Sequence, residues 1–193
     1  NTVLATGHAP LTGIAVNESG LYISGWDMGN PSQTNTTYFG TPGAFLATKP
    51  VSITGAGQSL FVSKFSLQGS RLWSTYFSAY SPGGGGVSSI RPNLAGGNFN
   101  SFRSLTATSD GVFLSGHTVG TGITTPGVFQ PQKIGGSAHF IVNFSDIGER
   151  VWCSYLGNFS GSDQGGSYQG AMHSGLHHDS EGTIYISGAT HQT

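Results

Sequence analysis

The sequence repeats itself. The stretch Asn17–Gly25 returns as Thr108–Gly116 and again, with one residue inserted, as Asp179–Gly188. A second stretch, Phe61–Phe77, returns as Phe140–Leu156. Repetition of this kind is typical of arrays of small units, because one unit alone cannot bury its apolar face and must stack on its neighbours. We therefore expect a repeat architecture.

Each copy consists of short apolar runs separated by turn residues, which is the pattern of β-strands. In the first copy the predicted strands are 11–16, 21–26, 59–66 and 71–77. In the second copy they are 102–108, 112–117, 138–145 and 150–156, and the third copy supplies 171–178 and 183–189. No stretch keeps a helical period over eleven or more residues. We predict an all-β fold of four-stranded antiparallel sheets, about two and a half repeats in all.

The copies are separated and interrupted by segments of variable length. Repeat 1 covers about 11–80, a Gly-rich insertion about 81–101, repeat 2 about 102–157 and a partial repeat 3 about 168–193. The longest segment inside a copy runs from Asp27 to Gln58. Loops that vary over a fixed scaffold commonly carry binding specificity, so we expect function to reside there.

The composition excludes several classes of partner. Charged residues make up only 8% of the chain, and the net charge is −1 with no run of Lys or Arg. Nucleic acids and anionic membranes are bound by basic surfaces, so neither is an expected partner. No apolar run is long enough for a membrane-spanning helix. The single cysteine, Cys153, leaves no disulfide framework. Low charge with many polar and aromatic residues favours a secreted or cell-surface location.

Three motifs together resemble a known repeat. They are Gly13–Gly25, then Thr41-Pro-Gly-Ala-Phe45 with its echo Thr125-Pro-Gly-Val-Phe129, and Phe61–Phe65 leading to Leu72–Tyr76. They resemble the SBBP-type repeat of seven-bladed β-propellers in bacterial secreted and surface proteins. The resemblance implies four-stranded blades around a channel. Two and a half blades cannot close a ring, so we expect the remaining blades from the same or a neighbouring chain. It implies no catalytic residue.

The functional prediction rests on aromatic residues in or beside polar loops. An aromatic ring can stack on a sugar or a protein side chain while neighbouring polar groups orient the ligand. The candidate ligand-binding residues are Trp26, Asp27, Tyr38, Phe39, Phe159 and Tyr168. The alternative is that these rings fold back over their own blades. We predict a non-enzymatic binding or adhesion module for a glycan or protein partner, or alternatively a structural spacer.

Catalytic residues and cofactors are not predicted. The chain contains no nucleophile elbow, phosphate loop or calcium loop. A propeller-type glycan hydrolase or lyase needs two facing carboxylates, and Asp27 and Asp163 are the loop candidates. Most other carboxylates sit in the repeated hairpin turns, where solvated turn chemistry explains them. His173 and His177 are weak metal candidates, because alternate strand residues share a face and imidazole is a common ligand.

Overall fold

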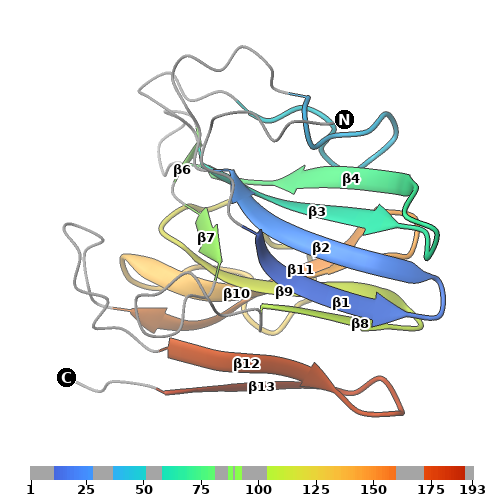
Figure 1. The fold of residues 1–193 in the computed structure, drawn as a ribbon. Coiled ribbons are helices and arrows are strands. Elements are labelled where there is room, and N and C mark those ends of the chain that lie inside the picture. Colours follow the sequence, from blue (N-terminus) through green and yellow to red (C-terminus); the bar gives the residue numbers. More distant parts are fainter. Residues whose placement is uncertain are drawn as a thin grey trace.

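The structure, a computed structural model, describes residues 11–27, 37–50, 58–80, 87–88, 90–92, 104–159 and 172–189. The first sheet has four antiparallel strands whose order in the sheet follows the chain: β1 (Leu11–Asn17), β2 (Gly20–Asp27), β3 (Ser59–Phe65) and β4 (Arg71–Phe77). Figure 1 shows these strands side by side in one twisted layer. Among the described residues no helix is long and apolar enough to span a bilayer.

The second sheet repeats this arrangement. Its strands β8 (Leu105–Thr108), β9 (Gly111–Thr118), β10 (Ser137–Phe144) and β11 (Arg150–Phe159) again pair antiparallel in chain order. A fifth strand, β7 (Ile90–Pro92), lies on the same edge of β9 as β8 does. β7 pairs with residues 116–118 of β9, whereas β8 pairs with residues 111–114. The remaining pairs are β12 (Met172–His178) with β13 (Ile184–Ala189), and β5 (Ala79–Tyr80) with β6 (Val87–Ser88). The predicted all-β fold with four-stranded antiparallel sheets is confirmed, although part of the predicted insertion is strand.

Equivalent turns join equivalent strands in the two sheets. Gly69 in the β3–β4 turn has φ 88°, and Gly148 in the β10–β11 turn has φ 89°. Glycine is favoured at both positions because a Cβ atom is strained at positive φ. In each turn the glycine amide donates to the carbonyl of the serine three residues earlier, Ser66 or Ser145. The sequence repeat is therefore a repeat of backbone conformation.

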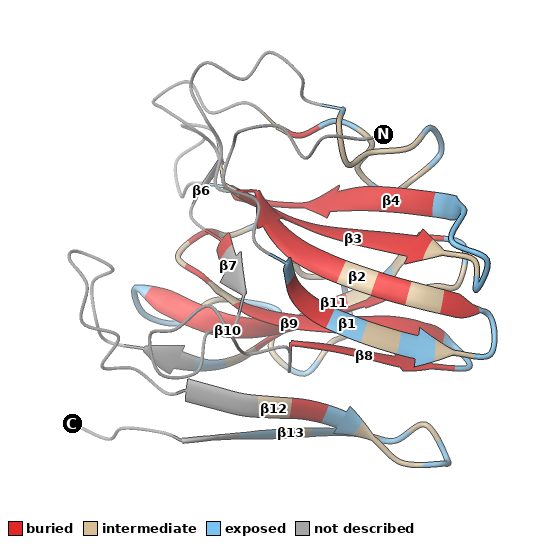
Figure 2. Cartoon of the chain, in the orientation of Figure 1, coloured by how far each residue is buried: buried red, intermediate tan, exposed pale blue. Residues whose placement is uncertain are grey.

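The sheets stack face to face and bury a core between each neighbouring pair. Figure 2 shows most of β2, β3, β4 and β10 as buried. The main core lies between the first two sheets, with Tyr22, Val62 and Phe77 from the first meeting Val112 and Phe140 from the second. A smaller core joins the second sheet to the β12–β13 hairpin, and it contains Phe113, Ile141, Trp152, Leu156, Leu176, Ile184 and Ile186. Each unit thus buries its apolar face on the next.

The first strands of successive units lie beside one another. β1 contacts β8, and β8 contacts β12 (Figure 1). The approach of β1 to β8 is so close that a Cβ atom at Gly13 would lie 2.6 Å from the Cβ of Leu105. Ser104 also donates a 2.9 Å hydrogen bond from its hydroxyl to the Thr12 carbonyl. Gly13 is needed here because any larger residue would push the two strands apart.

The Thr-Pro-Gly-x-Phe motif covers the outer strand of each four-stranded sheet. The Thr41 amide donates to the Ser74 carbonyl, and the Ser74 amide donates to Thr41 Oγ1, at 2.9 and 3.0 Å. Thr125 makes the same two contacts with Cys153, at 3.1 and 3.2 Å. These bonds occupy backbone groups that an edge strand would otherwise present to another chain. The motif therefore protects the outer edges of β4 and β11.

Candidate functional site

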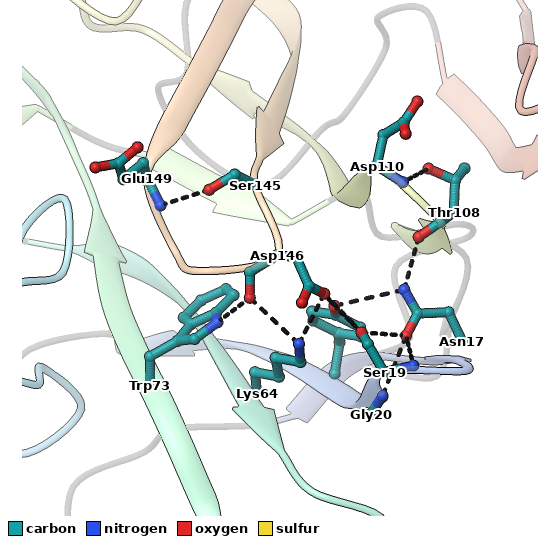
Figure 3. Close-up of polar contacts among 11 residues, drawn as sticks. Asn17, Ser19, Gly20, Lys64, Trp73, Thr108, Asp110, Ser145, Asp146 and Glu149 are labelled. Atoms are coloured by element: carbon teal, nitrogen blue, oxygen red, sulfur yellow. Dashed lines mark hydrogen bonds and ion pairs between the residues drawn. The ribbon is translucent and has the colours of Figure 1, made fainter.

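A cluster of polar side chains lies where the second sheet meets the first. Five members come from the first sheet and its turns, and one, Asp146, comes from the β10–β11 turn (Figure 3). We call this group the Asp146 cluster, and it consists of Asn17, Ser19, Tyr22, Lys64, Trp73 and Asp146. The local fold brings them together because the β10–β11 turn reaches across the boundary between the sheets.

Asp146 accepts hydrogen bonds through both its side chain and its main chain. Its Oδ1 atom accepts from the Tyr22 hydroxyl at 2.5 Å and from the Ser19 hydroxyl at 2.6 Å. The Lys64 ammonium lies 2.7 Å from the same oxygen. The Asp146 carbonyl accepts from Trp73 Nε1 at 2.8 Å and from Lys64 Nζ at 3.2 Å. One turn residue of the second sheet therefore binds four side chains of the first.

The electrostatics of this cluster are those of an ion pair rather than of a reactive group. The Lys64 side chain is 4% exposed and its ammonium lies 5.5 Å from the centre of the Tyr22 ring. Burial opposes ionisation of Asp146, but the hydrogen bonds from Lys64, Ser19 and Tyr22 outweigh it and lower the pKa of Asp146 to about 2. Burial and the bond to Asp146 raise the pKa of Tyr22. At neutral pH the cluster holds a carboxylate, an ammonium and a neutral phenol that satisfy one another.

Sequence reasoning missed the Asp146 cluster. Asp146 was expected to be a solvated turn carboxylate, whereas it binds Lys64 across a sheet boundary. The available signal is a departure from the repeat: Asp146 stands where the first copy has Leu67, and Lys64 stands where the second copy has Asn143. Asp146 and Lys64 carry opposite charges at repeat positions that are not equivalent. This is expected for a contact that forms at only one boundary between sheets.

The candidate binding residues Trp26 and Asp27 lie at the end of β2, and both are buried. Trp26 is 4% exposed and belongs to the main core. Asp27 is 8% exposed, and its Oδ1 atom lies 2.8 Å from Lys49 Nζ. Lys49 comes from the segment before β3 and balances the charge of Asp27. This ion pair places Asp27 in the structure as a buried, paired carboxylate.

Tyr38 and Phe39 fold back over the first sheet. The Phe39 ring stacks on Phe61 with centroids 3.8 Å apart, and the Tyr38 ring meets Phe39 edge-on at 4.7 Å. The Phe39 amide donates to the Tyr76 hydroxyl at 3.1 Å. Arg71 Nη1 donates to the Tyr38 carbonyl at 3.3 Å. Both candidate rings are half-buried, so each keeps part of its surface toward solvent.

The candidates Trp26, Asp27, Tyr38 and Phe39 do not share one site. Burial raises the pKa of Tyr76 to about 12, the bond from the Phe39 amide lowers it, and the charge of Asp27 raises it. Tyr76 holds Phe39 through its hydroxyl. Trp26 instead packs in the main core, and Tyr38 contacts Arg71, which lies at the opposite end of the first sheet from Asp27.

The other candidates lie elsewhere. Phe159 ends β11 and His173 lies on β12, but their side chains, like all of Tyr168 and Asp163, fall outside the described residues. His177 is exposed and stacks on His178 with ring centroids 5.7 Å apart. His178 points to the opposite face, where its Nδ1 lies 2.8 Å from Thr106 Oγ1. Within the described ranges no group of three or more His, Cys, Asp or Glu side chains is arranged to hold a metal ion.

Cys153 is a core residue of β11. Its side chain is fully buried, and burial raises the pKa of its thiol to about 12, with the charge of Arg150 opposing that shift. A nucleophilic cysteine needs a thiolate near neutral pH. The surroundings of Cys153 are those of a small packing residue.

No protein-family model matches the chain, and no curated protein matches it. The resemblance to SBBP-type repeats therefore stays a prediction from the motifs.

Proposed function

We propose that the sheets are consecutive blades of a β-propeller of the SBBP type, completed by further blades. Three features support this. The first two units are four-stranded antiparallel meanders, and successive units stack face to face. The first strands β1, β8 and β12 lie side by side, as strands that line a central channel do. The outer strands β4 and β11 are both covered by the Thr-Pro-Gly-x-Phe motif.

We further propose that this array is a non-enzymatic recognition module of a secreted or cell-surface protein, and that it binds a glycan or protein partner. The observation that carries the proposal is the corner formed by Tyr38 and Arg71. Tyr38 is backed by Phe39 and keeps part of its ring exposed, and the exposed Arg71 donates to the Tyr38 carbonyl. A supported ring beside a fork of hydrogen-bond donors is suited to a sugar or a polar protein surface.

The corner is built on a segment particular to the first unit. β2 and β3 are separated by residues 28–58, whereas β9 and β10 are separated by residues 119–136. Tyr38 lies three residues before Thr41, where the second unit has Gly122 before Thr125, so the ring is particular to the first unit. Specificity in repeat scaffolds commonly lies in such insertions, because the strands beneath them are fixed by packing. This supports recognition at the corner formed by Tyr38 and Arg71.

A structural spacer is the second candidate, and the Asp146 cluster favours it. The cluster joins adjacent sheets through an ion pair, two hydroxyl hydrogen bonds and one indole hydrogen bond. Such contacts make neighbouring units move together, which suits a stalk that holds other domains at a distance. A spacer predicts no ligand at the Tyr38 corner.

Glycan-array binding, followed by the same measurement on single variants, separates the two candidates. We expect the wild-type protein to bind a subset of glycans and the Tyr38→Ala and Arg71→Ala variants to lose most of that binding. Phe39 remains stacked on Phe61 in both variants, so the sheet beneath is preserved. Tyr185→Ala, an exposed tyrosine on β13, is the matched control and should bind as wild type. Undiminished binding by Tyr38→Ala would contradict the proposed site, and failure of the wild type to bind glycans or surface proteins would favour the spacer.

A further inference from the structure

The second sheet carries two histidines where the first sheet carries apolar core residues. His117 on β9 and His139 on β10 are direct cross-strand partners, as are Trp26 on β2 and Leu60 on β3. The sequence repeat aligns His117 with Trp26 and His139 with Leu60. Trp26 and Leu60 are 4% and 0% exposed within the main core. One unit thus fills this pair of positions with apolar side chains and the next fills it with imidazoles.

This exchange gives up apolar burial. His139 is 5% exposed, so a polar ring occupies a position where a leucine of the first sheet is buried. A buried imidazole forfeits much of the stabilisation that a buried leucine provides. The same strands keep the apolar residues Phe113 and Ile141 and also bury the polar residues Ser115 and Asn143. The histidine pair therefore replaces an apolar pair of the first sheet on a face of mixed character.

The geometry of the two rings suits a shared metal ion. Their centroids lie 5.7 Å apart and their planes are inclined by 68°. Imidazole nitrogens bind zinc at about 2.0–2.1 Å, and with roughly 1 Å from nitrogen to ring centre, two rings on one ion have centroids about 5–6 Å apart. The observed centroid distance of the two rings falls within this range.

The surroundings of His139 also fix its tautomer. Its Nδ1 atom lies 3.3 Å from the carbonyl oxygen of Gly116. A carbonyl can only accept a hydrogen bond, so Nδ1 carries the proton and the Nε2 lone pair is the one that can bind a metal. Metal-binding histidines commonly donate their other ring nitrogen to a backbone carbonyl, which orients the ring and raises its basicity.

We propose that His117 and His139 form a two-histidine site for a divalent transition-metal ion of the zinc, copper or nickel class, with water completing the coordination. Imidazole ligands favour these ions over calcium and magnesium, which prefer oxygen. The site is separate from His178, whose partner Thr106 pairs with Phe113, four residues or about 13 Å along β9 from His117. It lies on a different sheet from the Tyr38 corner and does not depend on the proposed recognition function.

Calorimetric titration of the protein with ZnCl₂ or CuCl₂ tests the site. The equivalent residues of the first sheet indicate which substitutions to make. The double substitution His117→Trp/His139→Leu installs the pair that the first sheet already accommodates. We expect the wild-type protein to bind the ion. We expect the double variant to bind it with an apparent affinity at least tenfold lower. His177→Ala, which removes an exposed histidine of β12, should leave the event unchanged. An identical isotherm for the double variant would overturn the proposal, since the ion would then sit on other histidines.

A second measurement needs no variant and stands even if the double variant does not fold. Substoichiometric Cu²⁺ or Ni²⁺ is added to wild-type protein while the histidine ring resonances are recorded by NMR. We expect the His117 and His139 resonances to broaden together and before those of His177 and His178. Broadening confined to His177 and His178, with His117 and His139 unaffected, would exclude the two-histidine site.

Discussion

The indole nitrogen of Trp73 donates a 2.8 Å hydrogen bond to the main-chain carbonyl of Asp146, a residue of the neighbouring sheet. The same turn places Gly148 against the Trp73 ring, where a Cβ atom would lie 2.8 Å from a ring carbon. The two sheets are thus joined by a fitted main-chain contact as well as by charges. In the second sheet the equivalent ring, Trp152, packs against Phe113 at a centroid distance of 5.9 Å and against the β12–β13 hairpin.

Removing the Asp146 carboxylate should destabilise the protein. In Asp146→Ala the Lys64 ammonium remains buried and keeps the main-chain contact to residue 146 and its position near the Tyr22 ring, but loses its carboxylate partner. We expect a loss of about 1–3 kcal/mol in the free energy of unfolding, because a buried charge loses its partner. Urea denaturation followed by tryptophan fluorescence measures this change. Glu149→Ala is the control, since Glu149 is exposed in the same turn and should change stability by less than about 0.5 kcal/mol. Equal effects of the two substitutions would contradict the assigned role.

The same carboxylate should make stability depend on acid pH. The pKa of Asp146 is about 2 in the folded protein, against 3.8 for an ordinary aspartate. A carboxyl group with a lowered folded pKa contributes stability that is fully present above its unfolded pKa and is lost as pH falls through its folded pKa. We therefore expect its contribution to disappear between about pH 4 and pH 2. Denaturation curves of wild type and Asp146→Asn in this range should converge as the pH falls, and a constant gap between them would be evidence against the lowered pKa.

Two equivalent phenylalanines should respond differently to truncation. Phe45 is 38% exposed and packs at the boundary of the first two sheets, with Phe77 and Phe144 at centroid distances of 6.4 and 6.1 Å and the Arg150 guanidinium 4.5 Å from the centre of its ring. Phe129 holds the same place in the second Thr-Pro-Gly-x-Phe motif and is 85% exposed. We expect Phe45→Ala to cost about 1–3 kcal/mol and Phe129→Ala less than about 0.5 kcal/mol. Thermal unfolding of both variants measures the two losses of stability. A larger loss for Phe129→Ala than for Phe45→Ala would contradict the prediction.

The thiol of Cys153 should be inert in the folded protein. Burial raises its pKa to about 12, so almost no thiolate is present at pH 8. We expect no reaction with Ellman's reagent at pH 8 under native conditions and one equivalent of reaction in denaturant, because the chain has one cysteine. Rapid reaction of the native protein would show that β11 opens readily or that the thiol is accessible.

Local signals in the sequence were sufficient for the strands. The predicted strand 71–77 is β4 (Arg71–Phe77), and the predicted strand 171–178 differs from β12 (Met172–His178) by a single residue. Turn glycines and two-residue alternation mark strand ends because both are properties of neighbouring residues. β7 (Ile90–Pro92) was not foreseen, since it lies in a Gly-rich stretch and forms by pairing with the distant β9.

The candidate site was harder to predict because it depends on partners distant in sequence. Trp26 ends the predicted strand 21–26 beside a polar segment, and Asp27 is expected in that loop. The structure instead extends β2 to Asp27 and pairs this residue with Lys49 from the segment that returns to β3. Asp146 has the local pattern of a solvated turn residue, and its partner Lys64 is 82 residues away. Local patterns do not specify such pairs.

The packing of the first two sheets on each other is the basis of the proposed propeller, and zero-length cross-linking tests it most directly. A carbodiimide activates the Asp146 carboxylate, which is 41% exposed, for amide formation with an amine in contact with it. Lys64 Nζ, at 2.7 Å, is the amine that the structure places there. We predict that mass spectrometry of the digested monomer finds a Lys64–Asp146 cross-linked peptide, and that Asp146→Asn removes it. Asp146 that is fully activated yet linked only to other amines, or not linked at all, would contradict the packing of the two sheets.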